Sequence, residues 1–102
     1  MCEFKIIDLE KNNQLAEEIV ILSYSNKNNL QLRDILGVSK ELESALIYNV
    51  NTLDQTCNIF QHSIVKPFIE LIKEINNNTL DVAKIKEFQL IIDNLKNEIS
   101  KK

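Results

Sequence analysis

The sequence of 102 residues has little glycine, proline or tryptophan: it contains one Gly, one Pro and no Trp. Glycine and proline shape many tight turns, and an all-β sandwich or barrel needs a large number of such turns. Their scarcity argues against an all-β fold. The length is typical of one folding unit, so we expect a single domain spanning residues 1–102.

Positive charge is not clustered along the chain. The formal net charge is −3 and the isoelectric point is about 5.1. A nucleic-acid-binding protein generally needs a basic face that displaces counterions from phosphates. No apolar run approaches the roughly 18–20 residues that span a bilayer. We therefore expect a protein partner, either another copy or a different protein, and neither a nucleic-acid nor a membrane partner.

Residue types that carry catalysis or bind metals are scarce. His62 is the only histidine, and Cys57 lies five positions before it. On a helix this spacing would place the two side chains about 140° apart, which is unsuitable for a nucleophile–base pair. Zinc sites need more His or Cys ligands, and a single glycine cannot form a phosphate-binding loop. We predict no enzymatic activity, no catalytic residues, no metal and no cofactor.

The two cysteines, Cys2 and Cys57, are too few for a disulfide framework. The first ten residues, MCEFKIIDLE, alternate in charge and lack the apolar run of a secretion signal. Both features predict reduced thiols and a cytoplasmic location.

Apolar residues recur mainly at helical spacing. Between Leu42 and Ile75 they follow one another at steps of three or four, with a mean of about 3.7, close to the period of an α-helix. This pattern predicts a long central helix at about residues 39–64, kinked or broken near Pro67. Other helices are predicted around residues 15–24, 30–36 and 80–99, with loops at 25–29 and 76–79, while residues 1–8 are left open between helix and strand.

The predicted fold is all-α, an antiparallel bundle of four to five helices around the long central helix. That helix would be ~39 Å long at 1.5 Å per residue, whereas a compact domain of this size is only ~33 Å across. Part of the helix would therefore need cover from a second copy or a partner.

The segment Ser44–Val65 carries one charged residue, Asp54. A solvated helix face normally holds Lys and Glu, and uncharged polar groups tolerate burial better than charges do. The segment is therefore predicted to be covered on both sides, by the chain's own helices or by a partner. A third interpretation is a solvated face in an Asn-rich sequence. The predicted partner interface consists of Tyr48, Asn51, Gln55, Asn58, Ile59 and His62.

These features predict a non-enzymatic helical protein–protein interaction module that self-associates as a homodimer. One alternative is a small immunity- or inhibitor-type protein that binds one protein target as a monomer. A second alternative is a DNA-binding regulator, because residues 30–46 resemble a degenerate helix-turn-helix at the turn around Gly37. No motif assigns the sequence to a family.

Overall fold

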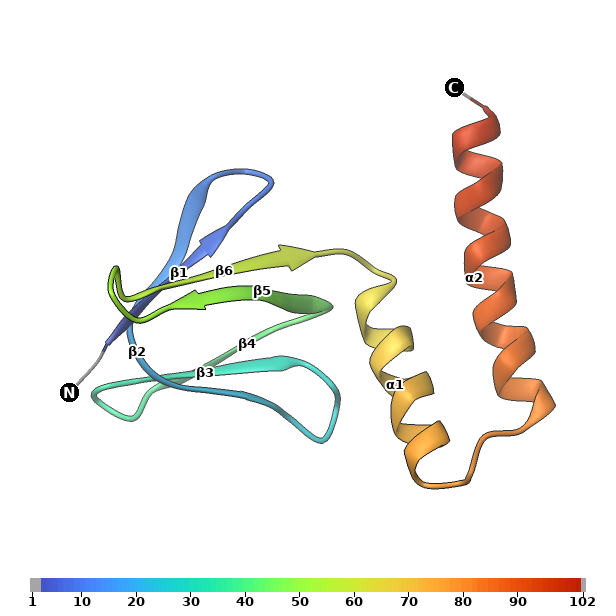
Figure 1. Ribbon diagram of the computed structural model, residues 1–102, viewed down its shortest axis with the longest axis horizontal. Helices are drawn as coiled ribbons and strands as arrows, with labels where there is room; N and C mark the ends of the chain where they lie inside the picture. The colour runs from blue at the N-terminus through green and yellow to red at the C-terminus, as the bar shows by residue number, and fades with distance from the viewer. Residues whose placement is uncertain (1–2, 102) are drawn as a thin grey trace. The chain divides into compact units, whose positions relative to one another are not determined.

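The computed structural model describes residues 3–101 and divides the chain into two compact units, Met1–Lys66 and Pro67–Lys102 (Figure 1). The six strands described lie in the first unit, and the second unit contains most of the first helix and the whole of the second. The single domain predicted for residues 1–102 stays a prediction. The strands are β1 (Phe4–Asp8), β2 (Asn13–Tyr24), β3 (Leu30–Asp34), β4 (Ser39–Leu42), β5 (Ala45–Asn51) and β6 (Thr56–Gln61), and the helices are α1 (Val65–Asn76) and α2 (Val82–Ser100).

The six strands form one mixed sheet in the order β4-β3-β2-β1-β6-β5. The pairs β1–β2, β2–β3, β3–β4 and β5–β6 are antiparallel. Strands β1 and β6 are parallel, with Lys5 opposite Thr56 and Asp8 opposite Ile59. The first strand thus lies inside the sheet, and β4 and β5 form its two edges.

Strand β2 is long because it pairs with different neighbours along its length. Its first part pairs with β1, and the part from Ile19 to Tyr24 pairs with β3. Ile19 lies opposite Phe4 on one side and opposite Asp34 on the other, and the pairing with β3 shifts register just after it. Glu18, immediately before, has a left-handed φ of 58°. Bulges of this kind bend a strand and increase its twist, so the sheet turns back on itself here.

The core lies between the two parts of this bent sheet. The Tyr24 hydroxyl donates a hydrogen bond to the Ala45 carbonyl of β5 at 2.8 Å, although β1 and β6 separate these two strands in the sheet. Core residues recur at every second position, for example Leu30 with Leu32, because alternate side chains of a strand share one face. The core consists of Ile6, Ile19, Leu30, Leu32, Leu42, Ala45, Cys57 and Ile59.

Most of the residues that have a left-handed backbone, with positive φ, are not glycine. Asn12, Asn28, Ser44 and Gln55 have φ values of 52°, 65°, 51° and 57°. Asparagine tolerates this region better than most residues because its short polar side chain bonds locally. Gly37 is also left-handed, at 87°, but it lies between β3 and β4 and does not end a helix. Scarce glycine therefore did not prevent a six-stranded sheet, although the chain as a whole, with two helices, is not an all-β fold.

The predicted all-α bundle of four to five helices is wrong, because residues 3–101 form six strands and two helices. The long central helix predicted at residues 39–64 consists of β4, β5 and β6. Leu46 and Leu53, which fit the helical period, are exposed, whereas Cys57 and Ile59, two positions apart, are fully buried. A stretch this rich in apolar residues fits both the helical period of 3.6 and the strand period of two. The observed burial follows the period of two.

The segments predicted as helices around residues 15–24 and 30–36 are β2 and β3. The recognition helix of the proposed helix-turn-helix at 30–46 is β4 followed by the start of β5, so that motif is absent from the described structure. Of residues 1–8, which were left open between helix and strand, Phe4–Asp8 form β1, and residues 1 and 2 lie outside the described residues. The predicted function, a self-associating helical module with its immunity-type and DNA-binding alternatives, therefore has no structural basis.

The last predicted helix, at residues 80–99, is confirmed as α2, and the loop predicted at 76–79 is confirmed between α1 and α2. Asp81 caps α2, because its carboxylate accepts a hydrogen bond from the Lys84 backbone N–H at 2.9 Å. Pro67 does not break a long helix. It lies in the first turn of α1, where a backbone N–H would have no helical partner.

Candidate functional site

Strand β5 is an edge of the sheet without charged residues. It pairs with β6 on one side, and within residues 3–101 no strand pairs with its other side. Its sequence, ALIYNVN, contains neither Lys, Glu nor Pro, the residues that usually protect an edge from pairing with another chain. The opposite edge, β4, carries Lys40 and Glu41. Only one of the two edges is therefore protected by charge.

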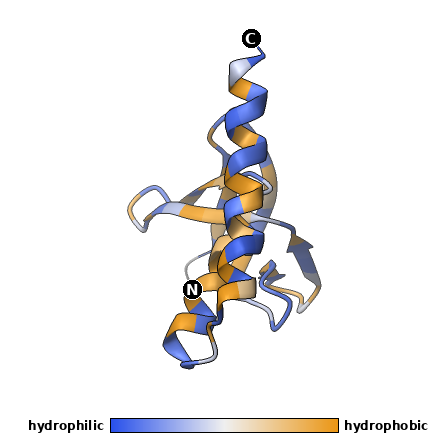
Figure 2. Cartoon of the chain, turned by 90° about the vertical axis from the view of Figure 1, so that its right-hand side faces the viewer, coloured by the Kyte–Doolittle hydropathy of each residue, from blue (hydrophilic) through white to orange (hydrophobic). Residues whose placement is uncertain are grey.

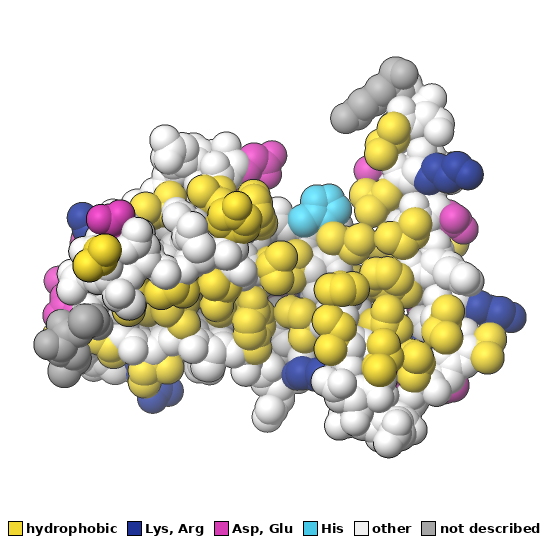
Figure 3. All heavy atoms as spheres, viewed as in Figure 1, with side chains coloured by type: hydrophobic (Ala, Val, Ile, Leu, Met, Phe, Trp, Pro, Cys, Tyr) yellow, Lys and Arg dark blue, Asp and Glu magenta, His cyan; other side chains and the backbone are white. Residues whose placement is uncertain are grey.

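The exposed side chains of β5 are largely apolar. Leu46, Tyr48 and Val50 are 44%, 62% and 49% exposed. Tyr48 lies edge-on to Phe60 of β6, with ring centroids 5.2 Å apart and planes at 71°. A register shift between Ile47 and Asn49 marks a bulge at Tyr48. Figure 3 shows apolar side chains gathered over the viewed face of the sheet unit. The exposed pair of Tyr48 and Phe60 adds apolar surface on β5 and β6.

The side chain of Tyr24, from β2, contacts the first residues of β5 at this edge. Its hydroxyl bonds to the carbonyl of Ala45 and also interacts with the backbone of Ile47. Burial raises the pKa of the Tyr24 hydroxyl above its ordinary value of 10.0, and the bond with Ile47 partly offsets that rise. The strand is therefore closed by a side chain at Ala45–Ile47 and open from Tyr48 to Asn51.

Replacing Tyr24 by Phe should lower the free energy of unfolding at pH 7 by about 0.5–1.5 kcal/mol, the contribution of one hydrogen bond. A pKa that folding raises favours the protonated hydroxyl, so this stabilisation is complete below pH 10 and is lost as the pH rises through the folded pKa. Urea unfolding at pH 7, 9 and 10.5 should show the wild-type advantage shrinking at the highest pH. A constant difference would contradict this origin, and Tyr48→Phe serves as the exposed control.

The structure distributes the residues of the predicted interface over several elements. Tyr48 and Asn51 lie on β5, Gln55 lies in the β5–β6 turn, Asn58 and Ile59 lie on β6, and His62 follows β6. They do not share one helical face. Ile59 is fully buried and cannot contact a partner. For Tyr48 and Asn51, which lie on the open part of the edge, a role in binding stays a prediction.

Polar residues of the predicted interface make local hydrogen bonds within or beside the β5–β6 hairpin. The Asn58 amide donates to the Asn49 side chain across the β5–β6 pair at 2.8 Å. The Nδ1 atom of His62 accepts a hydrogen bond from the Ile64 backbone N–H at 3.1 Å, just before α1 begins. The Asn51 side chain accepts two backbone N–H groups of its own turn, from Leu53 and Asp54. These residues shape the hairpin more than they form one continuous surface.

Leu46, Val50 and Phe60 were missed as surface residues, because the helical interpretation assigned them to the core. The alternation of buried and exposed residues along β6 distinguishes surface residues from core residues. Cys57 and Ile59 point inward, so Asn58 and Phe60 point outward. Leu46 lies opposite Phe60 and therefore shares its face, whereas Val50 lies opposite Cys57, beyond the bulge at Tyr48, and is half-exposed on the inner face. The period of two thus identifies Leu46 and Phe60 as exposed once the segment is treated as a hairpin, and the bulge explains why Val50 does not follow it.

Cys57 and the acidic residues do not form a recognisable reaction centre. The Cys57 thiol is fully buried, and burial raises its pKa, which opposes formation of the reactive thiolate. No group of three His, Cys, Asp or Glu side chains in the described part of the chain could hold a metal ion. The absence of enzymatic activity and of cofactors stays an expectation.

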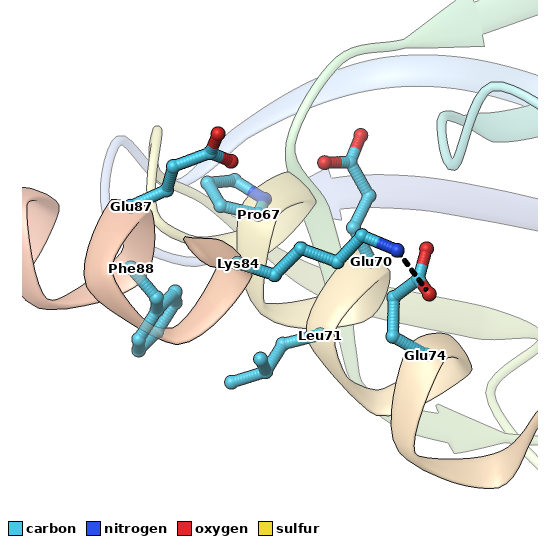
Figure 4. Close-up of a pocket in the computed structure, with 7 residues that line it drawn as sticks. All are labelled: Pro67, Glu70, Leu71, Glu74, Lys84, Glu87 and Phe88. Atoms are coloured by element: carbon cyan, nitrogen blue, oxygen red, sulfur yellow. Dashed lines mark hydrogen bonds and ion pairs between the residues drawn. The ribbon is translucent and has the colours of Figure 1, made fainter. Parts of the chain in front are cut away.

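A small hollow lies within the helical hairpin (Figure 4). Its volume is about 160 Å³, below the roughly 300 Å³ at which small-molecule sites begin. The Lys84 amine binds the Glu74 carboxylate at 2.7 Å, and Thr79 donates a further hydrogen bond to that carboxylate. These bonds lower the pKa of Glu74 and join the end of α1 to the loop before α2. Figure 4 shows Glu70 and Glu87 directed away from Leu71 and Phe88, so the hollow is best explained as part of the hairpin's structure.

The two helices leave many apolar side chains exposed. Phe68 of α1 contacts Phe88 of α2, with ring centroids 6.1 Å apart. No described residue of α2 is buried. Hydrophobic and hydrophilic residues alternate along α2 in Figure 2. The exposed apolar residues of the hairpin are Phe68, Ile72, Ile75, Val82, Ile85, Leu90, Ile92 and Ile99.

Comparison with known proteins identifies no family. No helix among residues 3–101 combines the length and the apolar character that crossing a bilayer requires. No protein-family model matches the sequence, and no curated protein matches it as a relative. The open, uncharged edge at β5 is the feature of the described structure on which a functional hypothesis can be built.

Proposed function

We propose that the sheet unit is a protein-binding module that accepts an extended segment of another protein as an added strand along β5. The observation that carries this proposal is the contrast between the two edges of the sheet: β4 has charged side chains, and β5 has none. An exposed edge without charge invites pairing, and natural proteins generally protect edges that are not used.

Strand addition matches the chemistry of this edge. The backbone groups of an open strand can bind any extended segment, and side chains at alternate positions then select among segments. On the open part of β5 the selecting side chain would be Tyr48, with Phe60 of β6 beside it. A partner segment with apolar residues at alternate positions would place them against this surface.

The proposal includes a non-enzymatic role in the cytoplasm. Cys57 is a free, buried cysteine, as is typical of a reducing compartment. Binding by strand addition needs neither a cofactor nor a metal. The contacts that matter are made by the backbone and by uncharged side chains.

Selection of a displayed library of random dodecapeptides against the full chain tests this function. We expect enrichment of extended, β-branched sequences, and hydrogen exchange should show protection of amides at Tyr48–Asn51 in the complex. Val50→Lys places a charge on the open edge and should weaken binding at least tenfold. Leu36→Lys, at an exposed position in the β3–β4 turn, is the matched control and should have no effect.

Two results would overturn the proposal. One is a selection that yields no binder above background. The other is a set of binders whose protected amides lie away from β5 and whose affinity is unchanged by Val50→Lys. Circular dichroism of both lysine variants would establish that each retains the folded sheet.

A further inference from the structure

The charges of the chain are distributed unevenly between its two units. Residues 1–66 contain nine Asp and Glu against six Lys and Arg, a net charge of −3. Residues 67–102 contain six of each sign and are neutral. The whole negative excess of the protein therefore belongs to the unit that carries the open edge.

Two of these acidic residues lie just outside the two ends of β5. Glu43 stands two positions before β5, and Asp54 lies in the turn that follows it. Both residues are exposed. Within residues 3–101, neither carboxylate has a Lys or Arg within ion-pair distance. Asp54 accepts one hydrogen bond, from the Asn51 amide at 3.1 Å, which leaves its charge uncompensated.

From this placement we infer that the partner segment is basic, with apolar residues at alternate positions in its centre and Lys or Arg near both ends. The inference rests on the proposed function, because it names the chemistry of the strand that β5 accepts. The uncharged centre of β5 selects for apolar and β-branched residues. The two carboxylates outside it attract cations at the ends of the added strand and repel acidic segments.

The same charges argue against a second copy of this sheet as the occupant. Two copies joined edge to edge would bring together two units of net charge −3. The Glu43 and Asp54 carboxylates of one copy would then approach the same acidic ends of the other. Like charges brought together across an interface oppose association, so a basic partner is the better match.

Three peptides with the same centre, Thr-Val-Thr-Val-Thr, provide a direct test when they are flanked on both sides by Lys, Ser or Glu. Fluorescence anisotropy with the full chain should show the Lys-flanked peptide binding about tenfold more tightly than the Glu-flanked one at 50 mM NaCl. Screening should reduce this ratio to about threefold at 200 mM NaCl. The double variant Glu43→Gln/Asp54→Asn should reduce it similarly at low salt, while Glu10→Gln should leave it unchanged.

The outcomes separate this inference from the proposed function. Equal binding of all three peptides, with loss of binding in Val50→Lys, would overturn the basic partner and keep strand addition. A preference for Lys that survives the double variant would also overturn the inference, because the charge would then act from elsewhere. Failure of all three peptides to bind at millimolar concentration would overturn the inference and the proposed function together.

Discussion

Replacing Ile59 by Ala should lower the free energy of unfolding by about 2–5 kcal/mol, the usual cost of truncating a large aliphatic side chain in a core. Ile59 is fully buried on β6, and its neighbours across the folded sheet include residues of β1 and β5. Urea unfolding followed by circular dichroism near 218 nm would measure the change.

Leu53→Ala is the matched control for Ile59→Ala. Leu53 is 94% exposed in the β5–β6 turn, so its truncation should change stability by less than about 0.5 kcal/mol. In a helix over residues 39–64 the order would be reversed, with Leu53 in the core and Ile59 outside. If both variants lost the same stability, or Leu53→Ala lost more, the result would contradict both the predicted size of the effect and the placement of Ile59 in the core of the sheet.

Asp8→Ala should lower the free energy of unfolding by about 1–3 kcal/mol, because it removes two hydrogen bonds that a buried carboxylate accepts from the backbone. Asp8 is only 4% exposed at the end of β1. One of its carboxylate oxygens accepts the backbone N–H groups of Glu10 at 3.0 Å and Lys11 at 3.2 Å. These bonds hold the turn between β1 and β2.

Asp8→Asn distinguishes this local role from the effect of charge. Its side-chain oxygen can accept the same two N–H groups, so it should retain most of the stability that Asp8→Ala loses. If Asp8→Asn is as destabilising as Asp8→Ala, the negative charge and not the turn geometry is what stabilises the fold. Unfolding curves at one pH for the three proteins provide the comparison.

The sequence predicted the helical end of the chain better than the sheet. Residues 82–100 have a helical pattern that is preceded by the Asn-rich loop and by the capping residue Asp81, and local signals of this kind suffice for an amphipathic helix. The strands depend on contacts that local patterns do not contain. Ile6 lies opposite Cys57 of β6, more than fifty positions later in the chain, and both side chains are fully buried.

Part of the candidate site was also accessible from the sequence. The shortage of charge in Ser44–Val65 is real, and Tyr48 and Asn51 lie on the strand that we propose as the binding edge. The physical cause was assigned wrongly, since a hairpin with one buried face explains the pattern better than a covered helix. Asparagine and glutamine in left-handed turns took the places where glycine would have signalled a hairpin.

The parallel pairing of β1 with β6 has a consequence during synthesis of the protein. Lys5 leaves the ribosome about fifty residues before its partner Thr56, so β1 must wait for most of the sheet to be made. Contacts so distant in sequence slow folding, because a long loop has to close before they form. We therefore expect the hairpins of the sheet to form before this ladder, and a chain that ends before β6 would lack the parallel partner of β1.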